Sequence, residues 1–229
     1  MEDLRRNWNE EFQSLYLHPI FSSQELQHVL LLRRDLMSNF LRFSRALATQ
    51  LVLQRSQAQE DWPIKPASQR LGIAGGEKFL VGTVLCKFAR DVLLGDDPNE
   101  KKNYIYYKSD DKAIRMAKNE IRHANAVLAH QSSRSALHLP WIACHRIRGH
   151  AVIVSALVPI QGSRTLVYGS NDAGRTVRKS DEAMNRLIDE LASCFGLDPH
   201  HVRGVASEDF RLSVAVDIEG HVSEVDGRK

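Results

Sequence analysis

The chain has 229 residues, of which 43% are hydrophobic and 26% are charged. This balance is typical of a globular protein of one or two domains, and it excludes a disordered tail, a collagen-like repeat and a solenoid of simple period. The formal net charge of +3 is modest, but residues 101–150 carry ten Lys and Arg against three acidic residues. The distribution of charge along the chain is therefore more informative about binding partners than the net charge is.

Cysteines, histidines and hydropathy indicate the class of protein. The three cysteines form no C-x-x-C pair and the histidines form no HExxH pattern, so we expect neither a disulfide scaffold nor a metal site. The longest apolar run, residues 151–160, is about half of the ~20 residues that a membrane helix needs. We expect a cytoplasmic protein with no membrane insertion, no cofactor and no catalytic residues.

Residues 1–62 predict a helical segment. Ser22 and Glu25 have the spacing of a capping box, in which each side chain satisfies a free backbone N–H of the first helical turn. Apolar residues then follow a three-to-four spacing, which predicts one long helix or two helices with a kink near residues 35–38. The predicted apolar stripe comprises Leu26, Val29, Leu30, Arg33, Met37, Phe40, Leu41, Ser44, Leu47, Leu51 and Val52.

Residues 63–229 predict an α+β body. β-Branched and aromatic residues indicate strands within residues 78–88 and at 104–107. Ser109 predicts the start of a helix with a solvated basic face. Its expected apolar positions are Ala113, Ile114, Ala117, Ile121, Ala124 and Leu128.

A hairpin is predicted next, turning at Arg148-Gly149, and its second arm is apolar enough to lie at the centre of a sheet. Residues 164–168 predict another strand. Ser180 predicts the start of a helix that ends at Gly196, and residues 212–218 predict a last strand.

The fold class that we expect is α+β, with the N-terminal helical segment packed on a mixed or antiparallel sheet that is followed by a helical part. The Asp226-Gly227 pair is typical of a hairpin turn. A strand beginning at Lys229 would have no continuation, so we expect the chain to be C-terminally truncated relative to a longer protein.

Three segments resemble a known family. NWNEEFQSL (residues 7–15), LVYGSNDAGRTV (166–177) and VDIEGH followed by DGRK (216–229) are similar, in this order, to the Clu domain of the clustered-mitochondria protein family. The resemblance implies a non-enzymatic cytosolic factor for mitochondrial distribution and biogenesis. It also implies association with mRNAs that encode mitochondrial proteins, with the translation machinery and with other domains of a longer parent protein.

The basic stretch is a candidate RNA-binding surface. Lys and Arg neutralise phosphates and release counterions, and Tyr104, Tyr106 and Tyr107 could stack on unpaired bases. The alternative is that the cations form the solvated face of a helix and the tyrosines are strand core, in which case the chain is a protein-interaction scaffold without nucleic-acid contact. The candidate residues are Lys108, Lys112, Arg115, Lys118 and Arg122.

The loop that follows the strand at 164–168 is a candidate anion site. Its glycines permit positive φ angles, and backbone N–H groups beside Arg175 could surround an anion. The alternative is a structural turn in which Asp172 caps its own backbone. The residues of this motif are Gly169, Asn171, Asp172, Gly174 and Arg175.

A kinase-like arrangement is the remaining alternative. In protein kinases a strand lysine pairs with a helix glutamate and a loop aspartate faces the substrate. Lys108, Glu120 and Asp217 occur in that order here, but no Gly-x-Gly-x-x-Gly loop precedes them. The alternative therefore covers a phosphotransferase and a catalytically inactive kinase-like scaffold. Asp217 and Glu219 together form a motif of unknown role.

Overall fold

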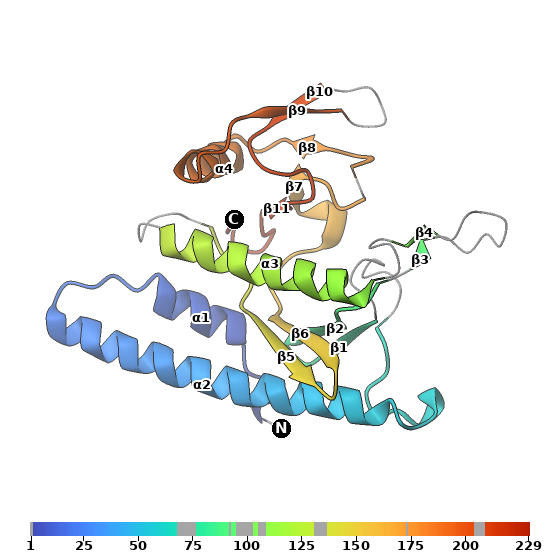
Figure 1. Ribbon diagram of the computed structural model, residues 1–229. Coiled ribbons are helices and arrows are strands. Elements are labelled where there is room, and N and C mark those ends of the chain that lie inside the picture. Colours follow the sequence, from blue (N-terminus) through green and yellow to red (C-terminus); the bar gives the residue numbers. More distant parts are fainter. Residues whose placement is uncertain are drawn as a thin grey trace. The chain divides into compact units, whose positions relative to one another are not determined.

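The structure is a computed structural model that describes residues 2–67, 77–91, 93–94, 103–104, 109–130, 137–172, 174–203 and 209–229 (Figure 1). It contains helices and antiparallel sheets, which confirms the α+β class. The chain divides into two compact units. Unit 1 comprises residues 1–125 and 140–157, and unit 2 comprises residues 126–139 and 158–229. The predicted division after residue 62 stays a prediction.

Unit 1 begins with helices: η1 (Glu2–Leu4), α1 (Trp8–Tyr16), α2 (Ser23–Gln54) and η2 (Gln59–Asp61). The predicted cap of α2 is confirmed, because the hydroxyl of Ser22 accepts a hydrogen bond from the backbone N–H of Glu25 at 3.1 Å. The helix is continuous over 32 residues, so the single-helix alternative holds. The predicted stripe is wrong in its first half, where Leu36 is buried and Met37 and Leu41 are exposed.

A four-stranded antiparallel sheet forms the body of unit 1. Its strands are β1 (Lys78–Val81), β2 (Val84–Phe88), β5 (Ile142–Ile147) and β6 (His150–Ala156), in the order β1-β2-β6-β5. The hairpin prediction is confirmed, and β6 is an inner strand as expected. A separate pair joins β3 (Leu93–Leu94) to β4 (Asn103–Tyr104).

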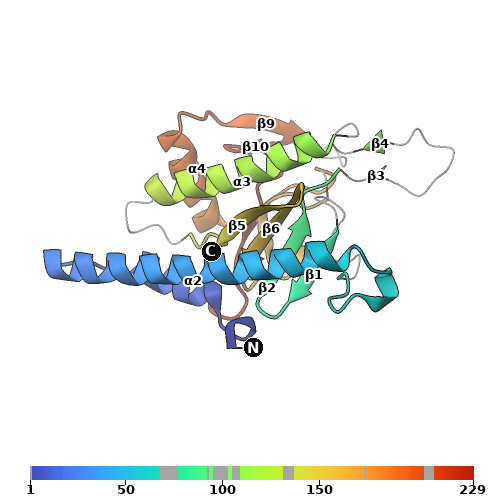
Figure 2. The same ribbon diagram turned by 60° about the horizontal axis from the view of Figure 1, so that its bottom comes forward.

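Helices cover both faces of this sheet. Figures 1 and 2 show α2 on one face and α3 (Asp110–His130) on the other. Alternation along β6 explains the arrangement, because successive side chains point to opposite faces. Ala151 and Ile153 pack with Ala117 of α3. Val152 and Val154, which are fully buried, point to the α2 face.

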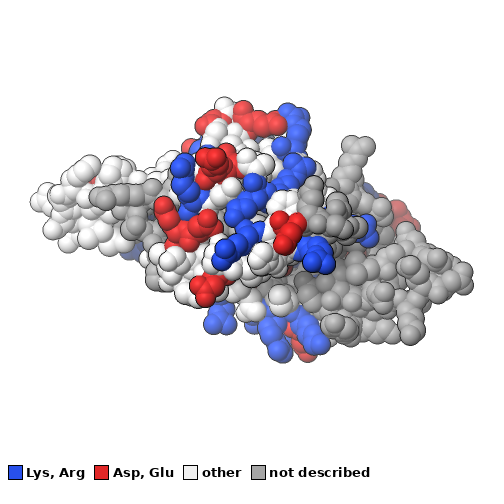
Figure 3. Space-filling model, turned by 90° about the horizontal axis from the view of Figure 1, so that it is seen from above, with Lys and Arg blue, Asp and Glu red and all other residues white. Residues whose placement is uncertain are grey.

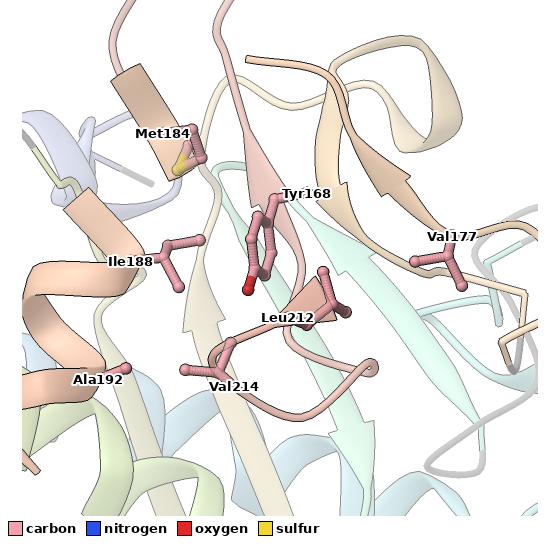
Figure 4. Packing of buried hydrophobic residues seen from close by; sticks show 7 residues of the cluster. All are labelled: Tyr168, Val177, Met184, Ile188, Ala192, Leu212 and Val214. Carbon is pink, nitrogen blue, oxygen red and sulfur yellow. The ribbon is translucent and has the colours of Figure 1, made fainter. Parts of the chain in front are cut away.

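Unit 2 comprises η4 (Gly162–Arg164), β7 (Leu166–Gly169), β8 (Arg178–Lys179), α4 (Glu182–Cys194), β9 (His200–Arg203), β10 (Asp209–Leu212) and β11 (Gly220–His221). Its sheets have the orders β11-β7-β8 and β10-β9. Figure 4 shows the ring of Tyr168 in the middle of a buried cluster, beside Met184 and Ile188 of α4. The Tyr168 hydroxyl accepts a hydrogen bond from the N–H of Ser213 at 3.1 Å, so its polar end is satisfied inside the core.

Two predictions for unit 2 are wrong at their boundaries. Asp181, not Ser180, caps α4, because the Asp181 carboxylate accepts from the N–H of Met184 at 2.6 Å while the N–H of Ser180 donates to the carbonyl of Val167 at 2.9 Å. The sequence predicts a strand at residues 212–218, but the strand observed here, β10, ends at Leu212, which is the last residue paired with β9. Ile218 instead donates to the carbonyl of Ala215 in a turn.

Candidate functional site

The start of α3 is fixed to the segment after β2. The Ser109 hydroxyl accepts from the N–H of Lys112 at 3.3 Å, which confirms the predicted cap. Asp91 and Asp110 tie the two segments together, because Asp91 Oδ2 accepts from the N–H of Ser109 and Asp110 Oδ1 accepts from the N–H of Asp91. The first turn of α3 is thus held in place, and the side chains that follow it are positioned by the helix.

The four candidate cations on α3 are Lys112, Arg115, Lys118 and Arg122, and all of them are exposed. The last three lie on one side of the helix, because their spacing of three and four residues corresponds to about one turn. Asp111 lies on the same side at its N-terminal end. Arg115, Lys118 and Arg122 make no ion pair within the described part of the chain. These three charges face solvent.

Glu120, the remaining acid of the helix, points elsewhere. Its carboxylate accepts from Nζ of Lys87 on β2 at 3.0 Å. The ion pair therefore removes the only acid between Arg115 and Arg122 from the basic side of α3. Such a partly exposed pair adds little stability, typically below about 1 kcal/mol.

The basic surface continues onto β5. Burial raises the pKa of the Cys144 thiol, while Lys118 and Arg146 oppose this rise by their positive charge. Arg146 is exposed on β5 and shares the α3 face of the sheet with Cys144. Arg146 is not among the site residues predicted from the sequence. It follows α3 in the chain, and it comes near this helix only because β5 pairs with β6 in the sheet that α3 covers.

The predicted RNA site also includes a lysine and three tyrosines before α3. Lys108, Tyr106 and Tyr107 lie outside the described residues, as does the side chain of Tyr104. On the face drawn in Figure 3, basic and acidic side chains lie close to one another. The outer side of α3 is therefore the candidate surface that the described residues define.

The loop after β7 is closed by its own side chains. The hydroxyl of Ser170 donates to Asp172 and accepts from the N–H of Gly174 at 2.9 Å, and the N–H of Thr176 donates to Asp172 Oδ1 at 2.8 Å. The bond from Thr176 is the main cause that lowers the pKa of Asp172 to about 2. A carboxylate already occupies the position that an anion would take. The geometry favours the turn hypothesis, with Arg175 exposed beside it.

This loop, which belongs to the second segment of the family resemblance, also contacts the third segment. Gly169 has a φ of +80°, and a Cβ there would lie 1.9 Å from the carbonyl oxygen of Ile218. The N–H of Ser170 donates to the carbonyl of Val216 at 2.8 Å, and Tyr168 pairs with Gly220 across β7 and β11. The second and third segments of the resemblance are thus joined by backbone contacts between residues 168–170 and 216–220.

Asp217 and Glu219, the motif of unknown role, are both exposed. Glu219 contacts Nε2 of His221 at 3.1 Å, and Nδ1 of the same ring lies 2.9 Å from the hydroxyl of Thr165. Thr165 is buried, and its hydroxyl also accepts from the N–H of Gln161. A buried hydroxyl that is already an acceptor is a poor nucleophile, so this chain of contacts is structural in character.

One feature of the kinase-like alternative is present in the structure. A strand lysine does pair with Glu120, but the lysine is Lys87 and not Lys108. The turn between β1 and β2 is the two-residue Gly82-Thr83, and the carbonyl of Leu4 lies against Gly82. The Thr83 hydroxyl also donates to the carbonyl of Arg6 at 2.6 Å. A turn that is packed in this way does not form a flexible loop over phosphates.

The described residues include neither a membrane-spanning helix nor a cluster of metal-ligating side chains. No helix within them is long and apolar enough to cross a membrane. Nor do they contain a group of three or more His, Cys, Asp and Glu side chains that could hold a metal ion.

Comparison with known proteins assigns the family. A family model described as Clustered mitochondria matches residues 7–229, which is nearly the whole chain and includes all three motifs. The chain belongs to the clustered-mitochondria family. The search of curated proteins and the search of solved structures found no match. Membership confirms the resemblance seen in the sequence and indicates a role in the distribution of mitochondria.

Proposed function

We propose that this chain is a non-enzymatic module of a cytosolic factor for mitochondrial distribution and biogenesis, and that it associates with mRNAs for mitochondrial proteins through the outer side of α3. The observation that carries the proposal is the exposed row Arg115, Lys118 and Arg122. Within a member of this family, an exposed basic row that makes no ion pair with a described residue is the feature that best fits a nucleic-acid partner. Association with the translation machinery is proposed on the ground of family membership alone.

The chemistry of this surface suits phosphates. A helix that presents cations at intervals of three and four residues can neutralise several phosphates of a single strand, with affinity coming from counterion release. The described part of this face carries no aromatic side chain, so it offers no stacking platform for base selection. Binding should therefore depend strongly on salt and weakly on sequence.

The proposal is tested by fluorescence anisotropy of a labelled single-stranded RNA titrated with the full chain at several salt concentrations. The variant carries Arg115→Glu, Lys118→Glu and Arg122→Glu. A matched control reverses three exposed cations of unit 2, namely Arg186→Glu, Arg203→Glu and Arg211→Glu. We expect the α3 variant to lose binding and the control to keep most of it, with the salt slope of the wild-type chain reporting about 0.7 per phosphate neutralised.

A result in which wild-type chain fails to bind at low salt would overturn the proposal. So would equal losses in the two variants, because binding would then follow net charge alone. Either outcome would favour the alternative of a protein-interaction scaffold without nucleic-acid contact.

One observation favours a second candidate, a nucleotide-binding but catalytically inactive kinase-like scaffold. The Lys87–Glu120 ion pair has the residue types and the strand-to-helix placement that orient nucleotide phosphates in protein kinases. Isothermal titration of the chain with ATP and Mg²⁺ tests it. Saturable binding that Lys87→Met abolishes would support this candidate, and absence of heat at millimolar nucleotide would remove it.

A further inference from the structure

β5 is an edge strand of the four-stranded sheet. It pairs with β6 along Ile142–Ile147, and within the described part of the chain no strand pairs with its other side. Figure 2 shows β5 running between α2 and α3, which cover the faces of the sheet rather than this edge. An open strand edge offers a row of backbone donors and acceptors that an extended peptide can use.

The register of the hairpin identifies the groups that are available. The N–H of Ala156 donates to the carbonyl of Trp141 at 2.8 Å, so these two residues form a hydrogen-bonded pair. Bonded and non-bonded pairs alternate along an antiparallel ladder. The residues that direct both N–H and C=O away from β6 are therefore Ile142, Cys144 and Arg146. No described residue hydrogen bonds to these groups.

The side chains around this edge are basic on both faces of the sheet. Arg146 is exposed on the α3 face, where Lys118 lies near it. Arg45 is exposed on α2 and is close enough to β5 to act on it electrostatically. The edge thus combines backbone groups that pair with no described residue and cations on both faces of the sheet.

We propose that the outer edge of β5 binds an extended acidic segment of a partner protein, which adds to the sheet as a fifth strand. Backbone hydrogen bonds to Ile142, Cys144 and Arg146 supply the register, and acidic side chains of the segment pair with Arg146 and Arg45. A second copy of this chain fits poorly, because two β5 edges would bring like charges together. The inference goes beyond RNA association, and the two cations that would pair with the segment, Arg146 and Arg45, lie outside the α3 row.

The first test uses a defined probe, a fluorescein-labelled eight-residue peptide in which valine pairs alternate with glutamate pairs, so that both faces of the added strand carry glutamate. One control peptide replaces glutamate by lysine, and another carries N-methyl groups on alternate residues so that it cannot pair with a strand edge. The full chain should bind the acidic peptide at least tenfold more tightly than either control. Equal binding of the N-methylated peptide would overturn the proposal, because attraction would then be electrostatic only.

The second test uses variants of the chain. Arg146→Gln removes the charge, whereas Arg146→Pro removes the charge and the outward N–H without breaking a bond to β6. Affinity for the acidic peptide should fall in Arg146→Gln and fall further in Arg146→Pro, and Arg45→Glu should lower it as well. Circular dichroism identifies any variant that fails to fold. If a variant does not fold, the control peptides still test binding to the β5 edge on the wild-type chain.

Amide hydrogen exchange gives a residue-level readout on the unaltered chain. Adding the acidic peptide should slow exchange at Ile142, Cys144 and Arg146, while Ala143 and His145, which already bond to β6, should change little. An absence of binding at millimolar peptide, together with self-association of Arg146→Gln, would overturn the proposal. It would identify Arg146 as a charge that protects the edge from aggregation.

Discussion

The hydroxyl of Ser44 lies 2.7 Å from Nε2 of His145, which joins the middle of α2 to the edge strand β5 inside unit 1. Both residues are buried, with Ser44 fully inaccessible and His145 8% exposed. A buried polar pair of this kind adds stability while both partners remain hydrogen-bonded, and burial disfavours the charged form of the imidazole. We therefore expect the packing of α2 on the sheet to depend on pH.

Burial, and to a smaller extent the charge of Arg45, lowers the pKa of His145. Because the unfolded chain binds this proton more readily, the contribution of His145 is present above about pH 6.5 and is lost as the pH falls through the lowered pKa. The free energy of unfolding, measured with urea, should therefore fall between about pH 7 and 5. His145→Gln should flatten this dependence, and His28→Gln, at an exposed position on α2, should not. Identical slopes in all three proteins would contradict the account.

Gly169→Ala should destabilise unit 2 more than an ordinary glycine substitution does. The positive φ alone costs roughly 1–2 kcal/mol for an L-residue. A new Cβ would also collide with the Ile218 carbonyl, so the total loss should exceed about 2 kcal/mol. Gly196→Ala is the matched control, since Gly196 has a φ of +67° but no atom within 4 Å of the added carbon. Thermal denaturation that gives equal losses would show that the Ile218 contact is unimportant.

Trp8→Ala should loosen the N-terminal helices from the sheet. Trp8 is fully buried, its indole N–H donates to the carbonyl of Asp3, and its ring lies 5.4 Å from that of Phe40 and 6.5 Å from that of Trp141. Removing a large buried aromatic side chain costs about 3–5 kcal/mol. Phe21→Ala should change stability by less than about 0.5 kcal/mol, because Phe21 is 85% exposed. Chemical denaturation of both variants checks the difference.

The Asp172 carboxyl should titrate near pH 2 in the folded chain. Its lowered pKa means that its contribution to stability is present above about pH 4 and is lost as the pH falls towards 2. A carboxyl-detected NMR titration measures the midpoint directly, and Ser170→Ala should move that midpoint upward by removing one hydrogen bond. A midpoint near 4 in the wild-type chain would mean that the loop is open and that its N–H groups are free for another anion.

Local chemistry accounts for the features that the sequence predicts correctly. The Ser22–Glu25 cap, the Ser109 cap and the Arg148-Gly149 turn each depend on residues within four positions of one another. The family assignment also depends on local sequence, since each of its motifs is a continuous segment.

Long-range packing accounts for the features that the sequence does not reveal. Leu36 is buried and Met37 is exposed, and which side of α2 is covered depends on the elements that pack on it, among them α1 and β5. The Lys87–Glu120 pair joins residues 33 positions apart, and Arg146 reaches the basic surface only through the sheet. Ser180 and Asp181 are both good caps, and the bond from Ser180 to Val167 decides between them.

The central claim is that this family member contacts mRNAs for mitochondrial proteins through α3. Ultraviolet crosslinking in cells that express the chain, followed by purification and sequencing of the bound RNA, tests it most directly. We expect enrichment of transcripts that encode mitochondrial proteins, with crosslinked peptides from residues 109–130, and loss of both when Arg115, Lys118 and Arg122 are changed to Glu. Unchanged crosslinking in that variant, or no crosslinked RNA with the wild-type chain, would contradict the account.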